Sequence, residues 1–255
     1  KVTRDLTAQR RVKVLEDEGR RMTTFLALLG HELRNPLAPI ANAVSVMQLE
    51  KMESENLRRC RDIISRQVTQ LTRLVNDLLD VGRITSGKVR LELTPLELTD
   101  IMREAVEMVE PLALARSHLL TVAAPPGTSF FVEGDHARLV QVFSNLLNNA
   151  VKFTPEGGKI TAALRRDGKY AEVSIKDNGP GIAPDRITEI FNLFVQGDQQ
   201  PGHLGAGLGL GLSLVQQLVT LHGGDIGAFS TGIPGQGSEF IVRLPLFVDE
   251  AGAAS

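Results

Sequence analysis

Apolar or small side chains recur at alternating spacings of three and four residues in two stretches of the first third of the chain. The first stretch comprises Val12, Leu15, Gly19, Met22, Leu26, Leu29 and Leu33. The second comprises Leu57, Cys60, Ile64, Gln67, Leu71, Leu74, Leu78 and Val81, interrupted only by Gln67. This spacing predicts two helices of about 30 residues, each with one narrow apolar stripe. A hairpin of two such helices leaves half of each stripe in water, so we expect two copies of the chain to form a four-helix bundle. A monomeric helical arm packed on the rest of the chain is the alternative.

After Ser86 and Gly87, the helical pattern gives way to short segments typical of strands. We expect strands at 89–93, 118–122, 130–133, 160–166, 171–176, 225–230 and 239–244, and helices at about 97–115, 135–152 and 208–222. This mixture predicts one sheet covered by helices in a compact α/β unit. The expected organisation is a helical domain at 1–86, an α/β domain at 87–248 and a tail at 249–255.

The sequence HELRNP at 31–36 lies where the first apolar stripe ends. His31 takes heptad position f, farthest from the stripe, and should face solvent. Pro36 and Pro39 have no N–H group for the helix ladder and are expected to bend or loosen the helix. A neutral imidazole can attack phosphorus through one ring nitrogen while a carboxylate such as that of Glu32 takes the proton from the other. Taken alone, an exposed histidine beside a glutamate is more often a solvated helix face.

Residues 135–152 place Asn145, Asn149 and Lys152 on one helical face, at positions i, i+4 and i+7. Asparagine is a poor residue inside a helix, and three of them within five positions, Asn148 included, cost roughly half a kcal/mol each. A solvated surface would more cheaply carry glutamate, lysine or glutamine. Mg²⁺ prefers oxygen ligands that it shares with phosphate and water. The pattern therefore predicts that the Asn149 side chain ligates Mg²⁺, with Lys152 and Asn145 near phosphates.

Two glycine-containing turns follow this helix. In the first, DNGPG at 177–181, Gly179 and Gly181 permit positive φ and let a ligand lie against the backbone, although such a sequence is also a common plain turn. The second provides the residues Gly207, Leu208, Gly209, Leu210 and Gly211. They open a helix whose free N–H groups and positive end suit phosphates. The long stretch between the turns is typical of a lid. Its Phe191 and Phe194 are either core anchors or a grip for the histidine helix.

The composition of the chain limits which binding partners and which cellular compartment are expected. The chain has 255 residues, 42% hydrophobic and 23% charged, and a net charge of −2, which gives no electrostatic reason to expect nucleic acid. Its one cysteine, Cys60, cannot form an intrachain disulfide, which fits a reducing, cytoplasmic compartment and a small core residue. No apolar run approaches the ~18 residues that span a bilayer. Any membrane anchor is therefore expected to lie outside this chain.

Five motifs, HELRNP, NLLNNAVKF, DNGPGI, FNLF and GLGLGLS, occur together in an order and spacing that resemble the sensor histidine protein kinases over about residues 20–247. The resemblance implies a dimeric four-helix bundle followed by a Bergerat-type (GHKL) ATPase sandwich. It implies His31 as phosphoacceptor, Glu32 as its base and Asn35 as a residue that orients water or an aspartyl phosphate in the reverse, phosphatase direction. It also implies that Asp177 accepts a hydrogen bond from the adenine amino group, that ATP and Mg²⁺ are cofactors and that a response regulator receiver domain is the partner. The sequence HELRNPLAP further resembles hybrid kinases.

The chain departs from this family in places. Leu208 stands where a small residue such as threonine is frequent, and Phe153 where tyrosine is common. Relatives that hydrolyse ATP, of the gyrase and MutL types, carry a glutamate at the position of Asn145, and an amide cannot act as a base. We therefore expect phosphotransfer to His31 over hydrolysis by a GHKL ATPase. The non-enzymatic alternative is a dimeric scaffold that binds ATP without transferring its phosphate.

Overall fold

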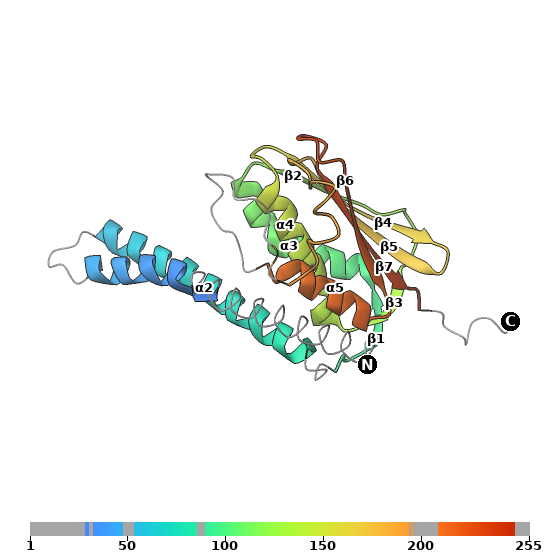
Figure 1. Ribbon diagram of the computed structural model, residues 1–255, viewed down its shortest axis with the longest axis horizontal. Coiled ribbons are helices and arrows are strands. Elements are labelled where there is room, and N and C mark those ends of the chain that lie inside the picture. The colour runs from blue at the N-terminus through green and yellow to red at the C-terminus, as the bar shows by residue number, and fades with distance from the viewer. Residues whose placement is uncertain are drawn as a thin grey trace, which may run out of the picture. The chain divides into compact units, whose positions relative to one another are not determined.

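The computed structural model describes residues 29–30, 33–47, 54–85, 90–193, 195 and 209–247 of the chain. These residues separate into two compact units, and the boundary between the units falls between Leu79 and Asp80. The first unit is helical, and the second contains the β-sheets (Figure 1). None of the described helices has an apolar stretch of the length that crossing a membrane requires.

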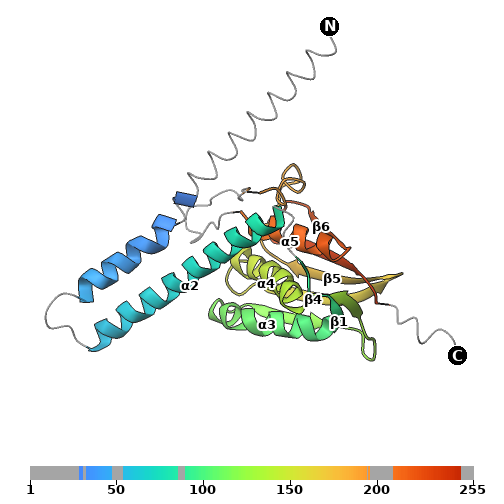
Figure 2. The same ribbon diagram turned by 90° about the horizontal axis from the view of Figure 1, so that it is seen from below.

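The helical unit is a hairpin. Residues 33–47 form a helix that runs antiparallel to α2 (Ser54–Thr85), as Figure 2 shows. The helix at 33–47 continues through Pro36 and Pro39, so neither proline ends it. The second predicted stripe faces inward in part: Cys60 and Leu74 are buried, and Ile64, Gln67, Leu71 and Leu78 are half-buried. The heptad spacing therefore identified the inner side of α2 from Cys60 to Leu78, whereas Leu57, the first residue of the predicted stripe, is exposed.

A further set of apolar side chains on this hairpin is exposed: Leu37, Val44, Val68, Val75 and Leu79. Leu37 and Val44 are seven residues apart, as are Val68 and Val75, so each helix presents an apolar line at heptad spacing. Such a surface is more apolar than a solvated helix face needs to be. It is the surface that a second hairpin in a four-helix bundle would cover.

The second unit is built on a five-stranded sheet with the order β2-β4-β5-β7-β6. Its strands are β2 (Leu119–Ala123), β4 (Lys159–Asp167), β5 (Tyr170–Asp177), β6 (Asp225–Ser230) and β7 (Ser238–Pro245). Strand β2 is parallel to β4, and the other neighbours are antiparallel. A separate antiparallel pair joins β1 (Thr94–Glu97) to β3 (Phe131–Gly134).

Three helices cover one face of the five-stranded sheet: α3 (Leu98–Ala115), α4 (His136–Phe153) and α5 (Gly211–Leu221) (Figure 1). The sheet contributes Ile160, Leu164, Val173, Ile175 and Val242 to the core, and the helices contribute Ile101, Leu139, Val142, Leu146, Leu214 and Leu218, all buried. Within each strand these residues are separated by an even number of positions, so the period of two places them on one face, the face that the helices cover. The predicted α/β unit is confirmed.

Side-chain caps fix where the helices of this unit begin. Oδ1 of Asp135 accepts a hydrogen bond from the backbone N–H of Arg138 at 3.2 Å, which starts α4. The Glu97 carboxylate accepts from the N–H of Thr99 at 3.4 Å and from the N–H of Phe130 at 2.8 Å. Glu97 therefore starts α3 and also ties its first turn to the segment that leads into β3.

Two elements of the second unit differ from the sequence prediction by more than one residue. The first strand was expected at 89–93, but residues 90–93 have no regular structure and β1 is Thr94–Glu97, which pairs with all four residues of β3. The alternation of Leu91 and Leu93 has the period of a strand, yet Leu93 is exposed. The last helix was expected from 208 but begins at Gly211, because Gly209 has φ +69°, which a right-handed helix excludes.

Candidate functional site

The aspartate that ends β5 is held in a fixed orientation. Oδ1 of Asp177 accepts a hydrogen bond from the N–H of Gly179 at 2.8 Å, and Oδ2 accepts one from the hydroxyl of Ser238 at 2.6 Å. The residue is only 6% exposed. The side chain of the neighbouring Asn178 accepts from the N–H of Lys159 at 2.7 Å, which pins the turn to β4. A buried and oriented carboxylate suits the recognition of a hydrogen-bond donor such as an exocyclic amine.

Glycines around Asp177 let three backbone segments approach one another. A Cβ atom on Gly237 would lie 1.9 Å from the carbonyl oxygen of Asp177. A Cβ atom on Gly179 would lie 2.8 Å from Oδ1 of Asp177 and 3.1 Å from the carbonyl oxygen of Phe153. Positive φ occurs at Gly181 (+79°), as predicted, whereas Gly179 is required by lack of space. The turn therefore lies directly beside Phe153, the last residue of α4.

Helix α4 carries the predicted polar face. Asn145 is buried, and Asn149 and Lys152 are half-buried. The amide of the adjacent Asn148 donates a 2.8 Å hydrogen bond to a carbonyl one turn earlier in the same helix. The ammonium nitrogen of Lys152 lies 5.0 Å from the ring centroid of Phe153. Asn148 thus serves its own helix, and Asn149 is the asparagine placed on the face with Asn145.

The carboxyl end of α4 is capped by two side chains that the sequence did not single out. Nη1 of Arg116 donates to the carbonyl oxygens of Val151 at 2.7 Å and Lys152 at 2.9 Å. Nε2 of His118 lies 3.1 Å from the same Val151 oxygen and donates to it. A cation at the negative end of a helix stabilises it and satisfies carbonyls that lack a partner in the helix. These caps fix the helix end from which Asn149 and Lys152 project.

The start of α4 is joined to the end of α5 through a histidine. Nε2 of His222 accepts from the backbone N–H of Asp135 at 3.0 Å, and its Nδ1 donates to the carbonyl of Leu218 at 2.7 Å. Burial lowers the pKa of His222, against the opposing effects of the Leu218 hydrogen bond and the Asp135 charge. The neutral tautomer with a proton on Nδ1 is the one that both hydrogen bonds require.

The glycine-rich turn is described from Gly209 onward, and Gly207 and Leu208 lie outside the described residues. The Leu210 side chain is buried, and the Ser213 hydroxyl donates back to the Leu210 carbonyl at 2.8 Å. Among the described residues, no side chain caps the N–H groups at the start of α5, which begins at Gly211. Backbone N–H groups at a helix start suit an anion, and phosphate binding here stays a prediction.

His31, Glu32 and Phe194 also lie outside the described residues. Asn35 is exposed on the helix at 33–47. Phe191 is half-buried, and its ring meets that of the buried Phe240 edge to face, with 6.4 Å between centroids and an interplanar angle of 85°. This contact favours the core-anchor alternative for Phe191.

The described side chains offer few ligands of the kind that a dedicated Mg²⁺ site needs. Among the described residues, no group of three or more histidine, cysteine, aspartate or glutamate side chains could hold a metal ion. A protein cage for a resident cation is therefore lacking in that part of the chain. Asn149 offers one amide oxygen on a half-buried helix face. One protein oxygen fits a Mg²⁺ ion that arrives with a nucleotide and takes its other ligands from phosphate and water.

Sequence reasoning missed the second wall of the Asp177 site. Gly237 and Ser238 stand in the segment GQGSEF, where two glycines precede a strand. A glycine directly before a strand can mark a place where another backbone approaches closely. What the spacing could not reveal is that this strand lies next to β5 in the sheet, because that pairing joins residues more than 60 positions apart in the chain.

Two family models match the chain. One, described as "His Kinase A (phospho-acceptor) domain", matches residues 21–87. The other, described as "Histidine kinase-, DNA gyrase B-, and HSP90-like ATPase", matches residues 134–248. The second match covers α4, the Asp177 turn, α5 and the Gly237–Ser238 segment.

Known proteins are similar to this chain over most of its length. The sensor histidine kinase GacS of Pseudomonas protegens is 32% identical over 226 residues, which are 87% of this chain and 24% of GacS. The structure of full-length ShkA in complex with AMPPNP is 32% identical with a TM-score of 0.65, covering 87% of this chain and 45% of ShkA. The histidine kinase ThkA in complex with the response regulator protein TrrA has the same fold, with a TM-score of 0.64 at 24% identity, over 94% of this chain and 64% of ThkA. The chain spans about a quarter of the length of the curated relatives it matches.

Proposed function

Because the chain belongs to the sensor histidine protein kinases of two-component systems, we propose that it transfers the γ-phosphoryl group of ATP to His31 and then to an aspartate of a response regulator. The observation that supports this most is that one chain joins a phosphoacceptor domain match to an ATPase domain match. We place a coiled-coil connector and the phosphoacceptor and dimerisation domain at 1–86, the ATP-binding domain at 87–248 and a tail at 249–255.

In this proposal Asp177 recognises the adenine amino group. Its carboxylate is buried and is oriented by Ser238 and Gly179, so it can accept a hydrogen bond without first reorganising. Gly179 and Gly181 let the base approach the turn. The residues at 207–211, together with Asn145 and Lys152 of α4, bind the phosphates in this proposal.

Mg²⁺ supplies charge neutralisation between the phosphate oxygens when it is bound. Asn149 is the residue that would hold it, through its side-chain oxygen. Arg116 and His118 act indirectly here, because they fix the end of α4 that carries Asn149. They are positioning residues in this proposal.

In the proposed phosphoryl transfer from ATP, the reacting residues of the protein are His31 and Glu32. One ring nitrogen of His31 attacks the γ-phosphorus, forming an N–P bond as the bond to the β,γ-bridging oxygen breaks, and ADP leaves with that electron pair. Glu32 takes the proton that the other ring nitrogen loses. Hydrolysis is disfavoured because the amide of Asn145 cannot remove a proton from water. Asn35 orients water or an aspartyl phosphate in the reverse direction.

The active form in this proposal is a homodimer. The exposed apolar lines on the helix at 33–47 and on α2 would be covered by a second hairpin. Sedimentation of the chain at micromolar concentrations should therefore give the mass of two copies. Val75→Glu, which puts a charge on the exposed line of α2, should shift the chain towards one copy. The charge-neutral exchange Thr72→Ser on the same helix should not.

Labelled phosphate on a histidine tests the central proposal. The chain is incubated with γ-labelled ATP and Mg²⁺, and the product is treated with acid or alkali. Phosphoramidate on imidazole should be lost in acid and survive alkali, and His31→Gln should remain unlabelled while still binding ATP. Label on the His31→Gln variant would refute the phosphoacceptor assignment. Nucleotide binding without label on the wild type would instead favour the scaffold.

A further inference from the structure

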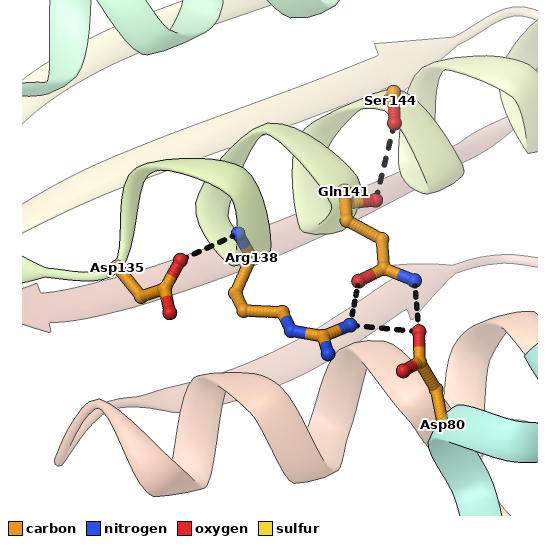
Figure 3. Close-up of polar contacts among 5 residues, drawn as sticks. All are labelled: Asp80, Asp135, Arg138, Gln141 and Ser144. Atoms are coloured by element: carbon orange, nitrogen blue, oxygen red, sulfur yellow. Dashed lines mark hydrogen bonds and ion pairs between the residues drawn. The ribbon is translucent and has the colours of Figure 1, made fainter. Parts of the chain in front are cut away.

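Asp80 makes a closed polar triangle with two residues of α4. Oδ2 of Asp80 accepts a 2.7 Å hydrogen bond and ion pair from Nη1 of Arg138 and a 2.9 Å hydrogen bond from Nε2 of Gln141. The same Arg138 nitrogen donates to Oε1 of Gln141 at 2.8 Å. Figure 3 shows these three side chains converging between the end of α2 and α4. We call Asp80, Arg138 and Gln141 the Asp80 triangle.

The triangle lies within the second unit, because the division of the chain falls just before Asp80. Helix α2 nevertheless continues without a break from Ser54 to Thr85. Asp80 is not one of the apolar stripe positions, so the hairpin does not need a carboxylate there. The side chain is only 12% exposed and that of Arg138 is 24% exposed. A carboxylate so covered is costly unless its partners stay in place.

The position of the triangle on α4 is informative. Arg138, Gln141, Asn145, Asn149 and Lys152 follow one another at steps of three, four, four and three residues. These steps keep all five on one face of a helix. The residues that contact Asp80 therefore belong to the same line as those proposed to hold Mg²⁺ and phosphate. Gln141 lies one turn from Asn145, or about 6 Å along the axis.

We propose that Asp80 is a positioning residue for phosphoryl transfer, because its triangle fixes the face of α4 that carries the nucleotide-binding residues to the end of the helix that continues into the phosphoacceptor domain. A group transfer between two domains depends on how often and in what orientation they meet. Two hydrogen bonds of fixed direction hold the Asp80 carboxylate on α4, so the last turns of α2 stay attached to the unit that carries α4. In this proposal the triangle acts on the transfer rate and leaves ATP affinity unchanged. This inference rests on the proposed kinase function.

A purely structural role predicts something different. In that case removing the triangle would lower the melting temperature, and the folded fraction would transfer phosphate at the wild-type rate. The two roles are separated by single-turnover rates at saturating ATP, measured well below the melting temperature, together with the Kd for ATP. Asp80→Asn keeps the shape of the side chain and removes its charge.

For Asp80→Asn we expect a transfer rate at least fivefold lower and a Kd for ATP within twofold of the wild type. Asp62→Asn, which removes an exposed carboxylate from the same helix, should leave both unchanged. The reversed pair Asp80→Arg with Arg138→Asp should recover part of the rate that Arg138→Asp alone loses. A wild-type rate or a faster one in Asp80→Asn would overturn the proposal, as would failure of the reversed pair to exceed Arg138→Asp.

Limited proteolysis keeps this test independent of the kinase activity. Trypsin can cleave after Lys88 and Arg90, just beyond the end of α2. Loss of the triangle should speed this cleavage several-fold in Asp80→Asn and not in Asp62→Asn. Equal cleavage in wild type and Asp80→Asn would contradict a restraint at this point. Suppose that the wild type takes up no label and that trypsin still cleaves Asp80→Asn faster than the wild type. This result would refute the kinase function and support the restraint by Asp80.

Discussion

The hydroxyl of Ser238, the first residue of β7, donates a 2.6 Å hydrogen bond to Oδ2 of Asp177, the last residue of β5. The carboxylate is thus held from both sides, since Gly179 donates to its other oxygen. Its orientation is set by the fold before any ligand arrives. In the proposed function this reduces the reorganisation that adenine binding requires.

Ser238→Ala should weaken ATP binding about tenfold, which corresponds to roughly 1.4 kcal/mol and is typical of a hydrogen bond to a charged group. The Asp177 carboxylate would lose one of the two hydrogen bonds that orient it. Titration with a fluorescent nucleotide measures the change. Ser174→Ala is the matched control, because its hydroxyl also donates to a carboxylate, that of Glu239, on the opposite face of the sheet. Equal effects of the two substitutions would contradict the role of Ser238.

Gly237→Ala should abolish nucleotide binding and destabilise the fold. Its Cβ would lie 1.9 Å from the Asp177 carbonyl oxygen, so β5 and β7 would have to move apart. Gly235→Ala is a close control: its φ is +87°, also left-handed, but a Cβ there meets open space. We expect Gly235→Ala to cost only the backbone strain, about 1–2 kcal/mol in urea unfolding, with ATP binding retained. Similar losses in both variants would show that strain alone matters.

Asn149→Ala should lower the autophosphorylation rate at least a hundredfold, because the proposed Mg²⁺ ligand is lost. Asn148→Ala should change it less than threefold, since that amide is bonded to its own helix backbone. Rates are measured with labelled ATP over a series of Mg²⁺ concentrations. If Asn149→Ala transfers phosphate at the rate of Asn148→Ala, the metal assignment is wrong.

The stability of the ATP-binding domain should fall as the pH drops below about 6.5, the ordinary pKa of histidine. Burial places the folded pKa of His222 below that value, so the unfolded state takes up the proton first. The contribution of neutral His222 is complete above this pH and is lost towards the lower folded pKa. Protonation would also set an N–H on Nε2 against the N–H of Asp135.

Urea midpoints at pH 7.5 and 5.5 measure this dependence. The decrease should be smaller in His222→Gln, whose side chain does not titrate, although this variant should be less stable at pH 7.5. His136→Gln removes an exposed histidine of α4 and serves as the control. An unchanged decrease in His222→Gln would rule out His222 as the group responsible.

Much of the architecture was predictable because it follows local periodicity. The apolar face of α4, with Leu139, Val142 and Leu146, is buried as its spacing required. Six of the seven expected strands lie within one or two residues of their predicted places. The strand predicted at 89–93 was wrong because alternating side chains indicate that a segment can form a strand but do not indicate which strand it pairs with. Only β3 decides which residues pair, and it pairs with Thr94–Glu97.

The sequence predicted those site residues that belong to one local motif. It did not predict the residues that reach the site through contacts between distant segments of the chain. Asp177 and the asparagines of α4 stand out as residue types that are unfavourable at their positions unless they have a use. Ser238, Arg116 and His118 do not stand out, since each is ordinary in its own segment. Their roles come from contacts with residues 33 to 61 positions away. Local patterns contain no record of such contacts.

The residues of α4 that contact Asp80 and those proposed to bind Mg²⁺ and phosphate lie on one face of the helix. This arrangement limits which insertions and deletions the helix can tolerate. One inserted residue between Gln141 and Asn149 would rotate everything beyond it by about 100°, so the Asp80 contact and the Asn149 side chain could no longer point the same way. Insertions and deletions should therefore be absent from this helix in natural variants, even where substitutions are frequent. The β4–β5 turn around Gly168, where an added Cβ meets open space, can lengthen without this penalty. A library of random insertions selected for signalling should recover variants there and none within α4.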